Sequence, residues 1–296
     1  MKKIKLFLLL LCTIGVLLCS SGCEILDTFL EEDLSQDERP AELLVSHFID
    51  VGQGDSEFIE LPNGETMLID AGVYDAGPVV TEYIKNLGYS KIDYLVATHP
   101  HADHIGGLRA VINEFEIGSV YMPKAETDTF SYEKLLTAIK NKGLKIKNTK
   151  AGTNIMKSDA YELSIDVLAP VGSKYESLND YSVVIRISYK QRRFLYMGDA
   201  EALSEGEILK KYSDMQADVI KVGHHGSSTS SSQAFIDAVK AKYAIFSLGK
   251  DNDYHHPHQK VVDRWKKAGV TMYRTDERGT ITISTDGTKL DVRTEK

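Results

Sequence analysis

Short runs of β-branched and apolar residues alternate with amphipathic segments over residues 45–296. Such runs, bounded by turn-forming residues, predict strands, and apolar residues at helical spacing predict helices. The expected strands cover residues 45–51, 56–61, 66–69, 94–97, 119–122, 163–168, 182–189, 193–197, 219–222, 244–247, 271–273, 280–284 and 289–293. The expected helices cover residues 79–87, 106–115, 131–142, 203–212, 232–240 and 260–268. Strands first cluster and then interleave with helices in both halves, which predicts sheet layers covered by helices, an α/β (α+β) fold.

Residues 1–22 have a different pattern. A basic start at residues 2–5 precedes an apolar run over residues 6–18, and small residues at 20–22 lead to Cys23. This is the layout of a secretory signal peptide, and the run is shorter than the ~18 residues that a mature membrane-spanning helix needs. A cysteine after a small residue also resembles a bacterial lipobox, although Ser20 stands where leucine is usual. The sequence therefore predicts an exported protein, either anchored to the membrane through a lipid on Cys23 or cleaved and secreted.

Composition and charge narrow the possible classes. Hydrophobic residues at 42% and charged residues at 26% are typical of a globular chain and exclude a disordered or fibrous one. Residues 23–44 carry much of the net charge of −8 and are expected to be an acidic, solvated tether. The rest is mildly acidic, so charge does not indicate a broad nucleic-acid face, although a local basic groove stays open. The cysteines all lie in residues 1–23, which excludes a thiol nucleophile in the body.

The strongest chemical signal is the segment THPHADHIGG at residues 98–107, directly after the apolar run at 94–97. In an extended segment residues i and i+2 point the same way, so His99 and His101 can bind one ion together. Asp103 and His104 fall where the chain turns into a helix and are expected to face a second ion. Imidazoles and carboxylates are the ligands of catalytic Zn²⁺ and Mn²⁺ sites. The alternative is a solvated histidine-rich loop.

These residues form the HxHxDH pattern of the metallo-β-lactamase fold, and the sequence resembles that superfamily. The resemblance implies a four-layer αββα sandwich, formed as a single hydrolase domain by residues 45–296. It implies that Asp70 supports the site and that Asp199, at the end of an expected strand, bridges two divalent ions. It also implies that the late pair His224 and His225 supplies a ligand to the second ion, and we favour His224.

Four segments indicate a subtype. FIDVGQGDS at 48–56, HPHADHIGG at 99–107, KVGHHGSS at 221–228 and TDERGTI at 275–281 resemble the hydrolase domain of ComEC-type competence proteins and its stand-alone relatives. The GQG turn at 52–54 is not a P-loop, because no Gly-Lys-Ser/Thr follows it. It can be a simple turn between strands, but the resemblance implies that Gln53 and Asp55 lie near the metal cleft.

One departure from the superfamily pattern concerns the first metal. Many members have a further histidine between the HxHxDH segment and the bridging aspartate, but no histidine lies between residues 104 and 199 here. The corresponding stretch holds Asn179, Asp180 and Ser182, which resemble an Asn-x-x-Ser element. Asn179, Asp180 or Ser182 could replace the ligand directly or through water. Such an oxygen-rich site would favour Mn²⁺ over Zn²⁺.

Several further polar residues have open roles. His256 can be a phosphate contact or a proton donor to the leaving oxygen, or it can cap the helix expected at 260–268. Ser227 lies in a Ser/Thr-rich segment that is either a capping loop or a phosphate contact. His47 and Trp265 are expected to be structural. Basic residues near the C-terminus are expected to form a solvated face, with a rim that guides DNA as the alternative.

Together these expectations describe a metal-dependent hydrolase. Two ions sharing Asp199 would activate a water molecule, which Asp103 could also orient, for attack on a phosphodiester. The resemblance implies a small-molecule or nucleic-acid substrate such as DNA, and no protein partner is evident. The alternatives are hydrolysis of a phosphocholine ester, a lactone or a β-lactam, and a non-catalytic surface lipoprotein that binds metal or DNA.

Overall fold

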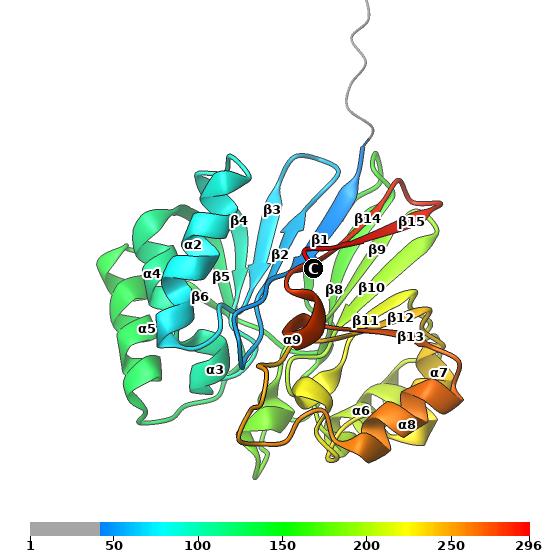
Figure 1. Cartoon of the computed structure of the whole chain (residues 1–296). Coiled ribbons are helices and arrows are strands. Elements are labelled where there is room, and N and C mark those ends of the chain that lie inside the picture. The colour runs from blue at the N-terminus through cyan, green and yellow to red at the C-terminus, as the bar shows by residue number, and fades with distance from the viewer. Residues whose placement is uncertain (1–41) are drawn as a thin grey trace, which may run out of the picture. The chain divides into compact units, whose positions relative to one another are not determined.

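Two β-sheets form the centre of the computed structural model, which describes residues 42–296 (Figure 1). The first sheet has the order β15-β14-β1-β2-β3-β4-β5-β6, and β3 to β6 are parallel. Its strands are β1 Leu44–Phe48, β2 Glu57–Glu60, β3 Thr66–Ile69, β4 Lys91–Val96, β5 Glu116–Met122, β6 Ile146–Asn148, β14 Ile281–Thr285 and β15 Leu290–Thr294. The predicted signal peptide, Cys23 and most of the predicted acidic tether lie outside the described residues. Within residues 42–296 no helix is both long and apolar enough to cross a bilayer.

The second sheet has the order β13-β12-β11-β10-β9-β8-β7, and β10 to β13 are parallel. Its strands are β7 Asn154–Ser158, β8 Leu163–Ala169, β9 Val184–Tyr189, β10 Arg192–Tyr196, β11 Val219–Lys221, β12 Tyr243–Phe246 and β13 Thr271–Arg274. The α-helices are α2 Gly77–Asn86, α3 Ala102–Ile105, α4 Leu108–Glu114, α5 Phe130–Asn141, α6 Ala202–Lys211, α7 Gln233–Val239, α8 Gln259–Lys267 and α9 Thr275–Arg278. Short 3₁₀ turns are η1 Tyr74–Ala76, η2 Leu178–Tyr181 and η3 Gly223–Gly226.

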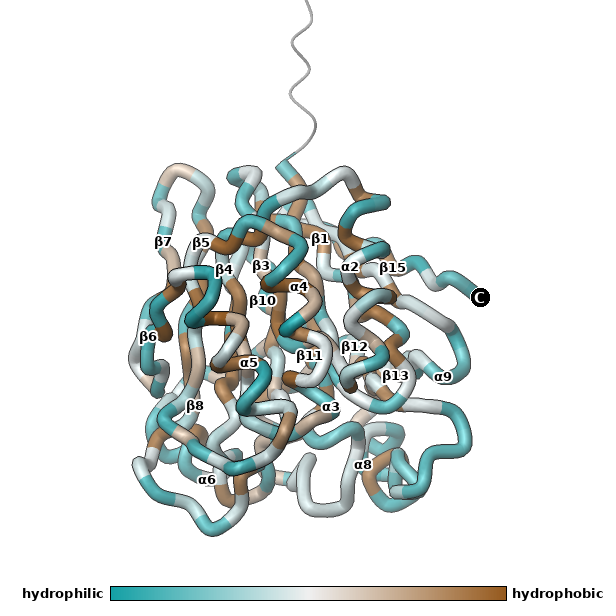
Figure 2. The backbone as a smooth tube through the Cα atoms, turned by 90° about the vertical axis from the view of Figure 1, so that its left-hand side faces the viewer, coloured by the Kyte–Doolittle hydropathy of each residue, from teal (hydrophilic) through white to brown (hydrophobic). Residues whose placement is uncertain are grey.

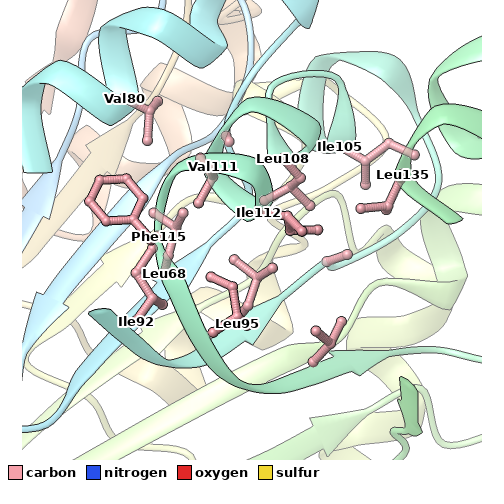
Figure 3. Close-up of a cluster of buried hydrophobic side chains, with 14 of the residues drawn as sticks. Leu68, Val80, Ile92, Leu95, Ile105, Leu108, Val111, Ile112, Phe115 and Leu135 are labelled. Atoms are coloured by element: carbon pink, nitrogen blue, oxygen red, sulfur yellow. The ribbon is translucent and has the colours of Figure 1, made fainter. Parts of the chain in front are cut away.

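Three buried apolar layers hold these elements together. The first joins β3 and β4 to α2, α4 and α5 and includes Leu95 and Ile112 (Figure 3). The second lies between the sheets, and the third joins the second sheet to α6, α7 and α8 around Trp265, which is fully buried as expected. Leu95 and Val96 belong to different layers because successive strand residues face opposite sides of a sheet. The layers follow the order helix, sheet, sheet, helix, which confirms the expected αββα sandwich.

Apolar positions concentrate on the strands, and hydrophilic ones cover the outer loops (Figure 2). Burying one leucine or isoleucine side chain stabilises the fold by about 1.5–3 kcal/mol, so this pattern supplies most of the driving force. His47 bonds Tyr83 and Glu60 at the side of the first sheet, at 2.9 and 2.8 Å. Its role is structural, as the sequence predicts.

Each strand predicted from the pattern is present, with ends shifted by a few residues, but two predictions were wrong in detail. Strands β6 and β7 were not expected, because they are sheet edges rich in exposed polar residues. The helix expected at 106–115 begins only at Leu108, as α4, and a separate one-turn helix, α3, precedes it and ends before Gly106-Gly107.

Candidate metal centre

The polar residues singled out by the sequence gather at the carboxyl ends of parallel strands. Asp70 follows β3, and the segment that starts at His99 leads from β4 into α3, at the lower end of the first sheet in Figure 1. Asp199 follows β10, and His224 and His225 follow β11. The carboxyl ends of neighbouring parallel strands meet at one edge of a sheet, and the two sheets are packed face to face. Residues that are distant in sequence therefore converge.

A glycine allows one of these loops to approach another. A Cβ on Gly54 would lie 2.2 Å from the carbonyl oxygen of Asp103, and the φ of Gly54 is +136°. The next residue, Asp55, donates its backbone N–H to the same carbonyl at 3.2 Å. Only glycine fits this position, so the GQG turn serves to bring Asp55 against the segment that carries Asp103.

Asp199 lies at the middle of the centre and is 1% exposed. Its Oδ1 lies 3.1 Å from His104 Nε2 and 3.5 Å from His225 Nε2. Its Oδ2 lies 3.7 Å from His99 Nε2 and 3.8 Å from His224 Nε2. The two carboxylate oxygens therefore face two different pairs of imidazoles.

Each pair has a further possible ligand. Asp103 Oδ2 lies 3.3 Å from His225 Nε2, which places this carboxylate with His104 and His225. His101 Nδ1 lies 3.0 Å from His99 Nε2, which places this imidazole with His99 and His224. The result is two sets of three donors, one on each side of Asp199. His99 and His101 thus lie together on one side of Asp199, and Asp103 and His104 lie on the other.

The imidazoles that face Asp199 are oriented through their other ring nitrogen. His104 Nδ1 lies 2.8 Å from Asp70 Oδ2, and His99 Nδ1 lies 3.1 Å from the Thr98 hydroxyl. His225 Nδ1 donates to the Ser247 carbonyl at 2.9 Å, and His224 Nδ1 lies 3.1 Å from Glu201 Oε1. Histidine ligands of metals are typically fixed in this way, with Nδ1 bonded to protein and Nε2 left for the ion.

Unpaired buried atoms test whether a cation fits here. His104 Nε2, His225 Nε2 and Asp199 Oδ1 are buried, and none makes a hydrogen bond of acceptable geometry within residues 42–296. Buried polar atoms without partners are rare in folded proteins, because each costs about 1–3 kcal/mol. A divalent ion coordinated by these nitrogen and oxygen atoms removes that cost. The donor set therefore fits Zn²⁺ or Mn²⁺.

The protonation states lead to the same conclusion. Burial lowers the pKa of His104, but nearby carboxylates, led by Asp199, outweigh burial and raise it well above 6.5. Burial also opposes a proton on His225, yet Asp199 and other acids raise its pKa to about 10. Burial raises the pKa of Asp199, but the charged imidazoles outweigh it and hold that pKa well below 3.8. The buried carboxylates require positive charge nearby, which protons on the imidazoles supply. A bound metal ion would supply that charge instead and replace these protons.

The sequence favoured His224 over His225 as the ligand on the side of Asp103 and His104, but the structure places His225 there. Both have left-handed backbone, with φ of 49° and 50°, so their side chains diverge to the two sides of Asp199. His225 is buried beside Asp103, whereas the His224 side chain is 22% exposed and lies on the side of His99. The geometry gives each of them a donor position, one on each side.

Asn179, Ser182 and Ser227 lie behind the imidazoles. Ser182 Oγ accepts from the Asp199 N–H at 3.0 Å and lies 3.4 Å from His99 Nδ1, so it holds both residues. Asn179 Nδ2 donates to Glu201 Oε1 at 3.2 Å, and its Oδ1 is buried without a hydrogen-bond partner. Ser227 is buried and its Oγ accepts from the Thr229 hydroxyl, which is the capping-loop arrangement.

A buried ion pair lies beneath the centre. Lys221 Nζ lies 2.7 Å from Asp55 Oδ2, and both side chains are at most 1% exposed. Asp55 Oδ1 lies 3.1 Å from His225 Nδ1. Glu57 is buried beside them, and burial followed by repulsion from Asp55 raises its pKa well above 4.5. Asp55 is thus a supporting residue, which links the Lys221 ammonium to His225.

The donors open onto a cavity of about 390 Å³. His101, Asp103 and His256 line it, together with Gln53 and Tyr254. His256 is 8% exposed, and burial followed by the charge of His225 lowers its pKa to about 4. Its imidazole is therefore neutral at neutral pH and lies within reach of a molecule in the cavity.

The fold and this donor set define the class of the protein. Residues 49–250 match the Metallo-beta-lactamase superfamily, and the chain belongs to that family. It is a metal-dependent hydrolase with histidine and aspartate groups that can hold metal. The expectation from the HxHxDH pattern is confirmed.

The relatives specify the subtype. ComE operon protein 3 of Bacillus subtilis (strain 168) is 33% identical over 250 residues, which are 79% of this chain and 32% of that protein. Competence protein ComA of Neisseria gonorrhoeae is 29% identical over 78% of this chain and 31% of its own length. Recombination protein 2 of Haemophilus influenzae is 26% identical over 95% of this chain and 33% of its own length. The chain spans about a third of the length of these relatives.

A solved structure supports the fold alone. CmlA, a diiron β-hydroxylase from Streptomyces venezuelae, has a TM-score of 0.53 at 14% identity and covers 81% of this chain and 53% of its own. The resemblance to competence hydrolase domains is thus confirmed through sequence, and the sandwich through structure.

Three residues of the site were missed in the sequence. Glu201 lies two positions after Asp199, and only the folded chain shows that it bonds His224. Lys221 was visible as a lone charge in an otherwise apolar strand, β11, which is a signal for a buried partner. Tyr254 gave no signal, because its place depends on how the loop after β12 folds back over the cavity.

Proposed function

We propose that the protein is an exported phosphodiesterase that uses two divalent ions, Zn²⁺ or Mn²⁺, to hydrolyse nucleic acid, with single-stranded DNA as the expected substrate. The observation that carries the proposal is the placement of Asp199 between two donor sets at the floor of an open cavity. Paired ions are typical of enzymes that displace groups at phosphorus. Relatives whose names refer to competence and recombination support a nucleic-acid substrate.

Each donor set would hold one ion. The first consists of His99, His101 and His224, so that His224 supplies the third imidazole that the sequence lacks between residues 104 and 199. The second consists of Asp103, His104 and His225. Asp199 would serve both ions through its two oxygens.

Bound divalent ions supply Lewis-acid charge to a phosphate and make water acidic enough to attack at neutral pH. The residues of this chain position the reactants. Asp103 lines the cavity as a carboxylate and can accept a hydrogen bond from the attacking water. His256 is neutral at pH 7 because its pKa is about 4, so it suits a hydrogen bond to a phosphate oxygen better than proton donation as an imidazolium.

The metal content and substrate class can be tested together. Purified protein loaded with Zn²⁺ or Mn²⁺ is expected to retain about two ions per chain and to hydrolyse bis-p-nitrophenyl phosphate and labelled single-stranded DNA. His101→Ala and Asp199→Ala should lose both metal and turnover. His255→Ala is the matched control, since His255 is exposed and does not line the cavity.

The other outcomes identify the alternatives. Hydrolysis of a lactone, a β-lactam or a phosphocholine ester without cleavage of nucleic acid would replace the proposed substrate. Retained metal with no hydrolysis of any of these would make the protein a binding module. Protein that contains no bound metal after metal loading would refute the proposal.

We also propose that a lipid on Cys23 anchors the protein to the outer face of the membrane, so that the membrane is a partner. Labelled palmitate is expected to enter the wild-type protein and not Cys23→Ser. Equal labelling of the two would contradict the anchor, and release of unlabelled protein into the medium would favour the secreted alternative.

A further inference from the structure

Exposed aromatic side chains are rare among residues 42–296. Among residues 42–296, the Phe, Tyr and Trp side chains classed as exposed are Tyr74, Phe130 and Tyr254. Tyr254 is 61% exposed and is the one that lines the cavity of the metal centre. An aromatic ring left open to solvent at the mouth of a catalytic cavity marks a contact for substrate.

The Tyr254 ring lies at the end of a row of rings that leads to the metal donors. It stacks on His256 with an interplanar angle of 21° and a centroid distance of 5.7 Å. His256 in turn stacks on His225 at 29° and 6.2 Å. Tyr254 is therefore two ring spacings from a proposed metal ligand, and most of its surface is open to solvent.

The loop that carries Tyr254 is fixed by its own hydrogen bonds. Asn252 Nδ2 donates to the carbonyls of Gly249 and His256 at 2.9 and 2.8 Å. Asn252 Oδ1 accepts from the His256 N–H at 3.0 Å. The ring is thus presented by a braced turn, which lowers the entropy cost of binding against it.

We propose that Tyr254 is a stacking platform for the nucleobase next to the scissile phosphate, so that the site selects nucleotide phosphodiesters with an unpaired base. This inference rests on the proposed phosphodiesterase function and adds the residue that would contact the base of the substrate. Every base has a face that can stack on a tyrosine, so this contact selects nucleotides without selecting sequence. Bases in a duplex are already stacked and paired, which favours single strands.

The surroundings favour a base over other ligands. A quaternary ammonium group is typically held by a cage of several aromatic rings, but Tyr254 is the single Phe, Tyr or Trp that lines this cavity within the described residues. The loop carries Asp251 and Asp253 against Lys250, so it adds no net positive charge to hold a long phosphate backbone. Recognition of one base does not need such charge.

A pair of small esters tests the inference. Thymidine 5′-(p-nitrophenyl phosphate) and the corresponding ester of 1,2-dideoxyribose have the same scissile bond and differ in the base. With the metal-loaded wild-type protein, kcat/KM is expected to be about 5- to 150-fold higher for the thymidine ester, which is the range of one stacking contact. Tyr254→Phe should keep this ratio, and Tyr254→Ala should bring it close to one. Tyr74→Ala, an exposed aromatic away from the cavity, should keep the wild-type ratio.

The results separate this inference from the proposed function. Equal turnover of both esters by the wild type, or a full ratio in Tyr254→Ala, overturns the stacking role and leaves the phosphodiesterase intact. A preference for p-nitrophenyl phosphorylcholine over the thymidine ester also overturns it and assigns the ring to a choline group. Turnover of none of these esters under any metal removes the proposed function, and the stacking role with it.

Discussion

Removing the Lys221 ammonium should destabilise the protein, although this residue lies outside the two donor sets. Lys221 Nζ forms an ion pair with Asp55 Oδ2 at 2.7 Å and donates to the Val222 carbonyl at 2.8 Å, and both members of the ion pair are buried. Breaking a buried pair by removing one partner costs about 3–5 kcal/mol, because the other charge stays buried without compensation. His225 still contacts Asp55 at 3.1 Å. We therefore expect Lys221→Met to lose about 3 kcal/mol of unfolding free energy.

Urea denaturation at pH 7 in the presence of a chelator measures this loss without a contribution from bound metal. Lys267→Met removes an exposed lysine and should stay within about 0.5 kcal/mol of the wild type. The double variant Lys221→Met/Asp55→Asn should recover part of the loss, since removing both charges leaves none uncompensated. A loss below about 1 kcal/mol in Lys221→Met would refute the reasoning.

The loss of unfolding free energy in Lys221→Met should depend on pH in a defined direction. Burial raises the pKa of Asp55, but Lys221 and His225 outweigh burial and lower it below 3.8. A carboxyl with a lowered folded pKa stabilises the protein above its unfolded pKa and loses this contribution as the pH falls. Without Lys221 that contribution shrinks, so the difference between variant and wild type should decrease as the pH falls toward and below 3.8.

Three further predictions concern the centre. Asp199→Asn should lower the metal content measured by elemental analysis, because it removes the charge shared by both donor sets, and wild-type content would contradict the site. Glu201→Gln should weaken metal binding by about 10-fold or more in a chelator competition, because the amide orients His224 less strongly, and unchanged affinity would make Glu201 incidental. His256 has a folded pKa of about 4, below its ordinary 6.5, so the unfolded chain takes up this proton first. The unfolding free energy of the chelated wild type should therefore fall from pH 6.5 to 4 more steeply than that of His256→Gln, and parallel curves would contradict the assignment.

The sequence pattern predicted the layers well because both sheets bury apolar residues on regular strands. It failed where pairing alone stabilises a strand. Strand β6 is Ile146–Asn148, and all three residues are exposed. It is held by hydrogen bonds to β5, which is distant in sequence. Neither an alternation of apolar and polar residues nor strand propensity therefore indicates it.

The candidate site divides in the same way. The HxHxDH segment is local, so spacing alone predicted that His99 and Asp103 face different partners. The separation of His224 from His225 depends on two successive left-handed residues, an arrangement that propensity does not predict. The role of Glu201 depends on its contact with His224, in a different segment, and the role of Tyr254 depends on how its loop folds. The residue pattern of a single segment predicts neither.

The donors are divided between the halves of the sandwich. The first sheet and α3 contribute His99, His101, Asp103 and His104, and the loops after β10 and β11 in the second sheet contribute the rest. Neither half can assemble a complete coordination sphere alone. The ions would therefore enter after the two sheets have packed, and their binding energy would oppose separation of the sheets. Metal scarcity would then lower the stability of the packed sheets as well as the turnover of the enzyme.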